Sequence, residues 1–181
     1  VAHHNAPSRR PFRSRQQGEI SMTKPVRVAF IASLLLGCAL LPAAHAFDAS
    51  VKTRLDARGI KHEVDGDGDY KVTYNYSKEG RTQLVFVSGK TESVGGFQVR
   101  EVFSPAARVE KDRINGAKAL ELMAESRKNK LGSWEIAGDV LYFVIKVPDS
   151  LDAAQLESAM DIAAQTADDM ELEISGDRDD L

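Results

Sequence analysis

The stretch Tyr70-Lys-Val-Thr-Tyr-Asn-Tyr-Ser-Lys-Glu-Gly-Arg-Thr-Gln-Leu-Val-Phe-Val-Ser88 decides the fold class of this 181-residue chain. Its first seven residues alternate, with Tyr and Val on one face and Lys, Thr and Asn on the other, which is typical of a half-buried strand. Lys78-Glu-Gly80 predicts a turn, and Thr82–Ser88 predicts a second strand that is apolar on both faces. The pair predicts an antiparallel hairpin.

Upstream of this hairpin, the sequence predicts a short helix and a tight turn. Ser50 can cap a helix with two apolar residues one turn apart, and Gly59 can end it. His62–Val64 can form a brief extended segment. Asp65-Gly-Asp-Gly-Asp69 predicts a turn, because glycine accepts positive φ and aspartate bonds its own backbone.

Downstream of the hairpin, the sequence predicts three more strands. Phe97–Ser104 follows a loop over Gly89–Gly96 and precedes a proline, which stops a strand. Trp134–Ala137 and Val140–Val147 are joined by Gly138-Asp139, a two-residue hairpin signal.

Two further helices are predicted from apolar residues at helical spacing. In Asn115–Lys130 the residues at this spacing are Ala117, Leu120, Met123, Ala124 and Arg127. After Pro148-Asp149-Ser150, which stops a strand and caps a helix, the stripe is Leu156, Met160, Ala163 and Ala167, with Glu157, Asp161 and Asp168 turned to solvent. For Asp169–Ile174 both a short strand and a helix extension remain open, and residues 176–181 are predicted to be an acidic disordered tail.

The predicted order α-β-β-β-α-β-β-α indicates an α+β fold, an antiparallel five-stranded sheet with helices on one face. The opening helix, the Asp/Gly turn before an aromatic strand, and the segment Ala119-Leu-Glu-Leu-Met…Trp134-Glu-Ile-Ala-Gly-Asp-Val-Leu-Tyr-Phe resemble the YbjN domain family over about residues 48–170. The resemblance implies the fold of type III secretion chaperones, and family members are described as sensory-transduction regulators without an established reaction. Similarity to these chaperones implies a homodimer that binds extended polypeptide. Secretion chaperones act in the cytosol, whereas this chain carries an export signal.

That signal is predicted between Met22 and Ala46. Lys24 and Arg27 form a basic region, residues 28–41 are almost entirely apolar, and Ala44-His45-Ala46 supplies the small residues that a signal peptidase needs. The apolar run is too short and wrongly flanked for a transmembrane helix. We expect cleavage after Ala46, a periplasmic location without membrane attachment, and one domain over residues 47–175.

Two alternatives concern this N-terminal region. Residues 1–21 are polar and arginine-rich, and Gly18-Glu19 can be encoded by a purine-rich ribosome-binding sequence, so we interpret them as translated leader; a genuine disordered basic tail is the alternative. Leu35-Leu-Gly-Cys38 resembles a lipobox, which would make the product a lipoprotein acylated at Cys38. The apolar run continues past Cys38 to Leu41, which favours cleavage after Ala46.

The charge distribution argues against some partners. Removing residues 1–46, which hold six basic residues and one acid, changes the net charge from −3 to −8. Residues 149–181 hold eleven acids and one base, whereas residues 47–148 carry +2. The acidic C-terminal part argues against nucleic acid and anionic lipid. The only cysteine is Cys38, so the exported domain has no disulfide and no thiolate.

Asp65, Asp67 and Asp69 place three carboxylates at alternate positions, as in a calcium-binding loop. Such a loop also needs Gly after the third ligand and Glu at its twelfth position, where this chain has Tyr70 and Tyr76. We therefore interpret the run as a solvated turn, with weak calcium binding as the alternative, and predict no cofactor.

The sequence does not predict an enzyme. His62 is the only histidine after residue 46, no nucleophile elbow is present, and one histidine without cysteine cannot readily build a zinc site. Gly95-Gly96 lacks the strand-to-helix setting of a phosphate-binding loop. A small periplasmic hydrolase that uses His62 and a calcium-responsive sensor that uses Asp65–Asp69 remain the alternatives.

The strands are apolar on both sides, and this pattern predicts a partner. Helices are expected to cover only one face of the sheet. If the second face were left bare, it would expose an apolar patch larger than monomers usually tolerate. We expect a non-catalytic regulatory or chaperone-like module. The second apolar face of its sheet is expected to bind either a second copy, as a homodimer, or an extended polypeptide. The proposed partner-binding residues are Val85, Val87, Val102, Tyr142 and Val144, which alternate with Leu84, Phe86, Phe103, Phe143 and Ile145. Among the aromatic residues, Tyr70, Tyr74, Tyr76, Phe97, Phe103 and Trp134 could form a binding platform but are expected mainly in the core.

Overall fold

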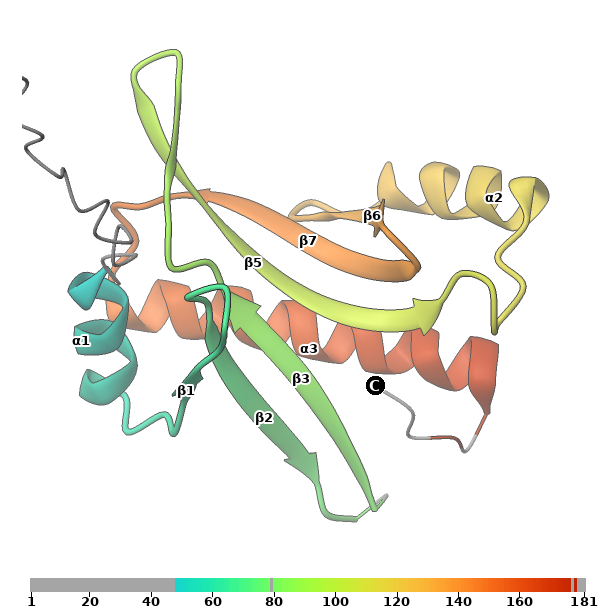
Figure 1. Cartoon of the computed structure of the whole chain (residues 1–181), viewed down its shortest axis with the longest axis horizontal. Helices are drawn as coiled ribbons and strands as arrows, with labels where there is room; N and C mark the ends of the chain where they lie inside the picture. Colours follow the sequence, from blue (N-terminus) through green and yellow to red (C-terminus); the bar gives the residue numbers. More distant parts are fainter. Residues whose placement is uncertain (1–47, 79, 177, 179–181) are drawn as a thin grey trace, which may run out of the picture. The chain divides into compact units, whose positions relative to one another are not determined.

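The sheet contains the predicted hairpins and two additional short strands. The computed structural model describes residues 48–78, 80–176 and 178. Its strands form one antiparallel sheet in the order β1-β2-β3-β5-β7-β6, with β4 paired to β5 outside this path (Figure 1). The strands are β1 (Glu63–Val64), β2 (Tyr70–Tyr76), β3 (Arg81–Val87), β4 (Glu92–Val94), β5 (Phe97–Arg108), β6 (Ser133–Ala137) and β7 (Val140–Pro148). The α+β class is confirmed, but the sheet has seven strands rather than five.

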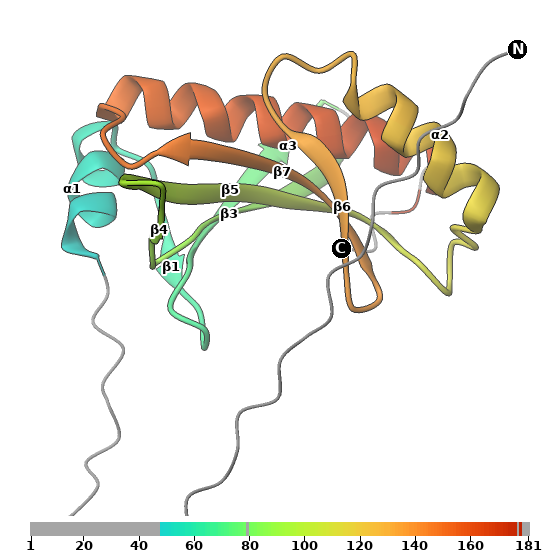
Figure 2. The ribbon, with the colours of Figure 1, turned by 90° about the horizontal axis from the view of Figure 1, so that it is seen from above.

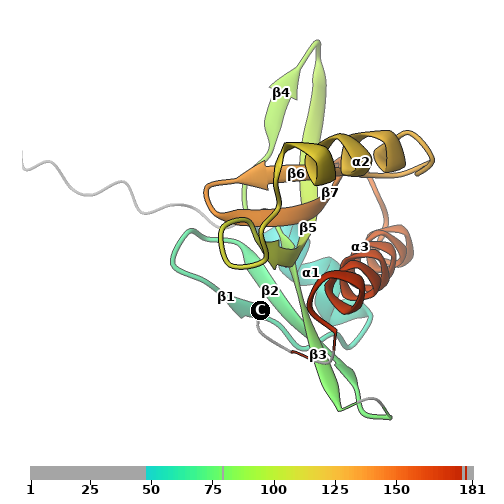
Figure 3. The same ribbon diagram turned by 90° about the vertical axis from the view of Figure 1, so that its right-hand side faces the viewer.

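The first added strand, β1, lies within the brief extended segment expected over His62–Val64, whereas β4 is too short for an alternation pattern to reveal. β1 pairs with β2 only at Glu63 and Val64. β4 forms within the predicted loop over residues 89–96, because Gly95 and Gly96 have φ of +57° and +89° and close a tight hairpin in which Val94 faces Phe97. Figure 3 shows this β4–β5 arm and the β2–β3 hairpin projecting from opposite ends of the sheet.

The described residues form three helices, which are α1 (Ala49–Ala57), α2 (Gly116–Ser126) and α3 (Ala153–Ser175). Figure 2 shows α3 lying along one side of the sheet, with α1 near one of its ends and α2 near the other. Asp48 caps α1 and Asp152 caps α3, two residues from the predicted Ser50 and Ser150. Asp152 caps α3 in place of Ser150 because Gln155 completes a capping box with it. Because α3 continues to Ser175, residues 169–174 are a helix extension and not a strand.

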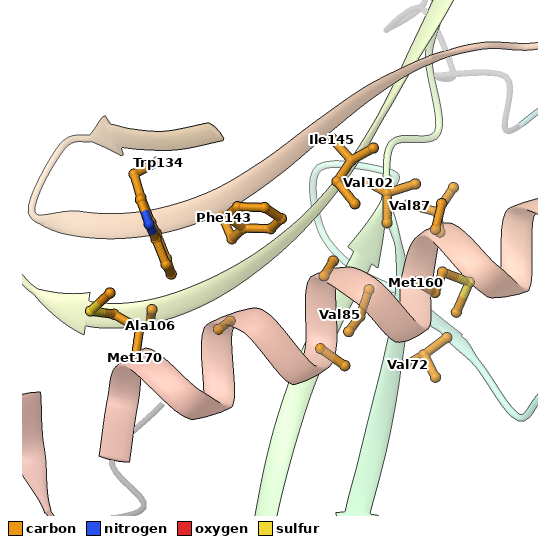
Figure 4. Close-up of a cluster of buried hydrophobic side chains, with 14 of the residues drawn as sticks. Val72, Val85, Val87, Val102, Ala106, Trp134, Phe143, Ile145, Met160 and Met170 are labelled. Atoms are coloured by element: carbon orange, nitrogen blue, oxygen red, sulfur yellow. The ribbon is translucent and has the colours of Figure 1, made fainter. Parts of the chain in front are cut away.

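The core lies between α3 and the sheet, as the close-up in Figure 4 shows. The predicted α3 stripe of Leu156, Met160, Ala163 and Ala167 is confirmed, since all four are buried. Small side chains along this stripe let the helix approach the strands closely. The strand residues packed beneath it include Val72, Val85, Val87, Val102, Phe143 and Ile145.

Two buried arginines tie α3 and its N-terminal approach to the sheet. Arg81 on β3 lies 3.1 Å from Asp168 and 3.2 Å from Glu171, measured from its Nε and Nη2 atoms. Arg100 on β5 donates from Nε to Asp149 at 2.7 Å and also pairs with Asp48. The prediction that Asp168 faces solvent was wrong: it is 2% exposed, because the inward-facing Arg81 requires a counter-charge.

Several predictions lie outside the described residues. They are the leader over residues 1–21, the signal peptide over 22–46 with Cys38 and the cleavage site after Ala46, and four of the six residues of the predicted tail over 176–181. Within the described part of the chain, no helix has the length and apolar character needed to cross a bilayer.

Candidate functional site

The sheet face opposite α3, which we call the open face, has an apolar centre and a polar rim. A single row of paired residues crosses it from β1 to β6, and its members in order are Glu63, Lys71, Phe86, Phe103, Val144 and Ser133. Charged or polar residues end the row, and apolar residues fill its middle. Interfaces between proteins have this anatomy.

Three aromatic side chains form the centre of the open face. The rings of Phe86 and Phe103 stack with centroids 5.2 Å apart, and Tyr142 meets Phe103 edge-on at 5.7 Å. All three are half-buried. Such cross-strand aromatic pairs stabilise a sheet and hold their rings in fixed orientations. The chain thus presents a rigid aromatic surface that none of its described helices covers.

Charged side chains border this aromatic centre on the β6–β7 side. Lys146 lies 2.8 Å from Glu135 and 3.6 Å from Glu101. The hydrogen bond with Glu135 is the main cause that raises the pKa of Lys146 above its usual value. The pairs are exposed and can exchange partners at little cost.

The predicted partner-binding residues divide between the two faces. Val85, Val87 and Val102 lie beneath α3 and are completely buried, whereas Tyr142 and Val144 lie on the open face, where Tyr142 is partly exposed and Val144 is only 7% exposed. The expectation that all five share one face is therefore corrected. Val102 pairs with Ile145, so the alternation of β7 is offset from the grouping that we expected. Alternation within a strand does not fix the register between strands.

A second apolar surface, which the sequence analysis missed, involves α2 and β6. We call it the α2–β6 patch: Leu120 and Met123 are 68% exposed, and Leu131 and Ile136 are 49% exposed. Leu120 and Met123, which the sequence analysis placed at helical spacing, lie on the exposed side of α2, and the helix buries Leu122 instead. The sequence has apolar residues on both sides of α2, which indicates that one side is exposed but not which side packs inward.

The Asp65–Asp69 segment is a turn stabilised by its own carboxylates. One oxygen of Asp65 accepts hydrogen bonds at 3.0 Å from the backbone N–H groups of Asp67, Gly68 and Asp69. Asp69 accepts from Gly89 N at 2.9 Å and so joins this turn to the end of β3. Burial raises the pKa of Asp69, and the neighbouring acids add to the effect. These bonds explain the segment without an ion.

His62 contacts a backbone carbonyl group and an aromatic ring. Its Nδ1 is 3.0 Å from the carbonyl oxygen of Ile60, and its ring centroid is 5.6 Å from that of Tyr70. It lines a hollow of about 270 Å³ together with Lys61, Lys71 and Thr73. Among the described residues, no group of three or more His, Cys, Asp or Glu is placed to hold a metal ion.

The other aromatic residues have separate positions. Tyr70 and Trp134 belong to the core, and Tyr74 donates a hydrogen bond to Asp161 at 2.8 Å. Phe97 is 68% exposed at the tip of the β4–β5 arm, beside Gly95 and Gly96. The aromatic residues therefore do not form one platform.

Comparison with models of known protein families gives no match, and comparison with curated proteins gives none either. The resemblance to the YbjN domain family stays a prediction.

Proposed function

We propose that this chain is a non-catalytic, polypeptide-binding module of the YbjN type, exported to the periplasm, that acts as a homodimer and uses the open face as its binding surface. The observation that supports this most directly is the aromatic row of Phe86, Phe103 and Tyr142 on the side of the sheet without helices. Rigid aromatic side chains bind apolar segments at low entropic cost, because few rotamers are lost on contact.

The α2–β6 patch supports the homodimer. Four large apolar side chains that are 49–68% exposed come from α2, β6 and the loop between them. A twofold axis through such a patch would bury it against its own copy. This arrangement leaves the open face of each copy for the polypeptide.

Binding to reduced, unfolded α-lactalbumin tests the open face. We expect micromolar binding, and an at least tenfold weaker affinity for Phe103→Ser, since a central aromatic anchor carries much of an interface's binding energy. Phe97→Ser is the matched control, because it removes an equally apolar and more exposed ring from the β4–β5 arm. Equal affinity of Phe103→Ser and wild type, with both folded by circular dichroism, would exclude the open face.

Sedimentation equilibrium tests the homodimer. We expect a dimer at tens of micromolar and a monomer for the double substitution Leu120→Glu and Met123→Glu. Leu172→Glu, at a position on α3 that is 37% exposed, should remain a dimer. A wild-type monomer at this concentration would contradict the homodimer and leave the polypeptide-binding proposal to the first experiment.

A further inference from the structure

The outer edge of β2 is paired along only a small part of its length. β1 covers Tyr70 and Lys71, and no other strand in the described part of the chain pairs with this side of β2. Asp65 N donates to Asp69 O at 3.0 Å, so Asp69 directs its backbone groups towards β1. Alternation along an antiparallel strand then directs those of Lys71, Thr73 and Asn75 to the same side. Thr73 and Asn75 lie beyond the end of β1.

A hollow flanks this edge on each face of the sheet, and Lys61 and Thr73 line both. The hollow on the open-face side, of about 270 Å³, is also lined by His62, Glu63 and Lys71. The hollow on the helix side, of about 210 Å³, is also lined by Tyr74, Glu157 and Asp161. Successive side chains of a strand point to opposite faces. A strand added beside Thr73 would therefore place neighbouring side chains in different hollows.

The two hollows differ in charge. Lys61 lines both hollows, so the difference comes from the other charged residues. On the open-face side these are Glu63 and Lys71, which pair at 2.9 Å, so with Lys61 this lining has a net charge of +1. On the helix side the two acids Glu157 and Asp161 outnumber Lys61, so this lining has a net charge of −1. Arg58 pairs with Glu157 from outside the hollow, and Asp161 accepts a hydrogen bond from the neutral Tyr74 hydroxyl, which does not neutralise it. Burial and then this hydrogen bond raise the pKa of Tyr74, so its hydroxyl stays protonated and remains a donor. The open-face side favours an acidic group, and the helix side favours a basic one.

We propose that the β2 edge binds an extended polypeptide segment by strand addition, and that it selects a segment in which an acidic and a basic residue are direct neighbours. Backbone hydrogen bonds to Thr73 and Asn75 supply the affinity, and the two hollows read the adjacent side chains. This inference rests on the proposed polypeptide-binding function and adds the register and the chemistry of the ligand.

Two labelled peptides of identical composition provide the probe. In Thr-Val-Thr-Glu-Lys-Thr-Val-Thr the charges fall on opposite faces of an extended strand, and in Thr-Val-Glu-Thr-Lys-Thr-Val-Thr they fall on the same face. We expect fluorescence anisotropy to give at least threefold tighter binding of the first peptide. Asp161→Asn should remove this preference, because it keeps the acceptor for Tyr74 but deletes the charge. Equal binding of both peptides to the wild-type protein would overturn the selection rule.

Strand addition itself is tested at Thr73. Thr73→Pro deletes the edge-facing N–H and should abolish binding, whereas Thr73→Val keeps it and should bind like wild type. Hydrogen exchange of the wild-type protein gives an independent readout that needs no variant: the amides of Thr73 and Asn75 should slow at least tenfold with peptide. Unchanged exchange at both amides under saturating peptide would overturn strand addition.

The outcomes separate this inference from the proposed function. If Phe103→Ser loses binding of unfolded α-lactalbumin while Thr73→Pro binds both probes like wild type, the open face stands and the edge is refuted. If only Thr73→Pro loses binding, strand addition at the β2 edge is supported and binding at the open face is refuted. If Thr73→Pro turns a dimer into a monomer without changing peptide binding, the edge holds a second copy and the inference is overturned.

Discussion

Replacing Arg100 by methionine should destabilise the domain by about 3 kcal/mol. Arg100 is 1% exposed, donates to Asp149 at 2.7 Å, and also bonds Asp48 and the carbonyl oxygen of Ser88. Removing one partner of a buried ion pair typically costs about 3–5 kcal/mol. We take the lower end because Asp48 and Asp149 are 32% and 26% exposed, so water can solvate them in part, and because Arg54 still contacts Asp149 at 3.0 Å.

Urea unfolding measures this loss. For an m-value of about 2 kcal/mol/M, a loss of about 3 kcal/mol lowers the midpoint by about 1.5 M. Lys146→Met is the matched control, since it also deletes a cation on the sheet but breaks only exposed pairs, which contribute about 0–1 kcal/mol. A midpoint for Arg100→Met within about 0.4 M of wild type would refute the reasoning, because it would mean that the buried network contributes no more than a surface pair.

The pH dependence gives a second check on the same network. Burial alone would raise the pKa of Asp149, but the hydrogen bonds and charges of Arg100 and Arg54 outweigh it and lower the pKa below its usual value. The pKa of Asp48 is also lowered, since bonds to Ser50 and the Arg100 charge outweigh burial. A carboxyl with a lowered folded-state pKa contributes stability above its unfolded value of about 3.9 and loses it as the pH falls. The stability gap between wild type and Arg100→Met should therefore be full at pH 7 and shrink below about pH 4.

Three further predictions concern the turn and the tyrosines. Gly89→Ala should lower the melting temperature by at least about 5 °C, because a Cβ there would lie 1.8 Å from the carbonyl oxygen of Gly68, whereas Gly66→Ala, with no atom within 4 Å, should melt like wild type. Titration calorimetry with millimolar Ca²⁺ should show no binding heat, because Asp65 already accepts three backbone N–H groups; saturable heat that Asp65→Ala abolishes would revive the calcium alternative. Tyr70 and Tyr74 should ionise above the usual value of about 10 in an absorbance titration, mainly because burial raises their pKa, and normal titration of all tyrosines would contradict their placement.

The strands and helices with strong periodicity could be predicted from the sequence. Hairpins flanking Lys78-Glu-Gly80 and Gly138-Asp139 and the α3 stripe follow from local patterns, and they suffice for the α+β class. That the sheet has a second, partly apolar face could be predicted from the sequence, but which residues form it could not. Whether Val144 lies with Val102 or with Phe103 depends on the β5–β7 register, which is fixed by long-range pairing.

The missed features have a common physical cause. Which side of α2 packs inward depends on what lies beneath it, and here Leu122 is buried while Met123 is exposed. Asp168 was expected at the surface because an isolated acid avoids the core, yet Arg81, 87 residues earlier, makes its burial favourable. Each case involves a partner distant in sequence, and a local pattern contains no information about such partners.

The two arginine clusters also hold α3 in place over its face of the sheet. Arg100 bonds Asp149 just ahead of α3, and Arg81 bonds Asp168 and Glu171 in its C-terminal half. From the cap Asp152 to Asp168 the helix rises about 24 Å, so the clusters fix it at two well-separated points. A shift of one turn, about 5.4 Å, would break both and leave buried charges unpaired. Because the valines beneath α3 can be reached only by such a shift, a partner that binds the native domain must use surfaces that are already exposed.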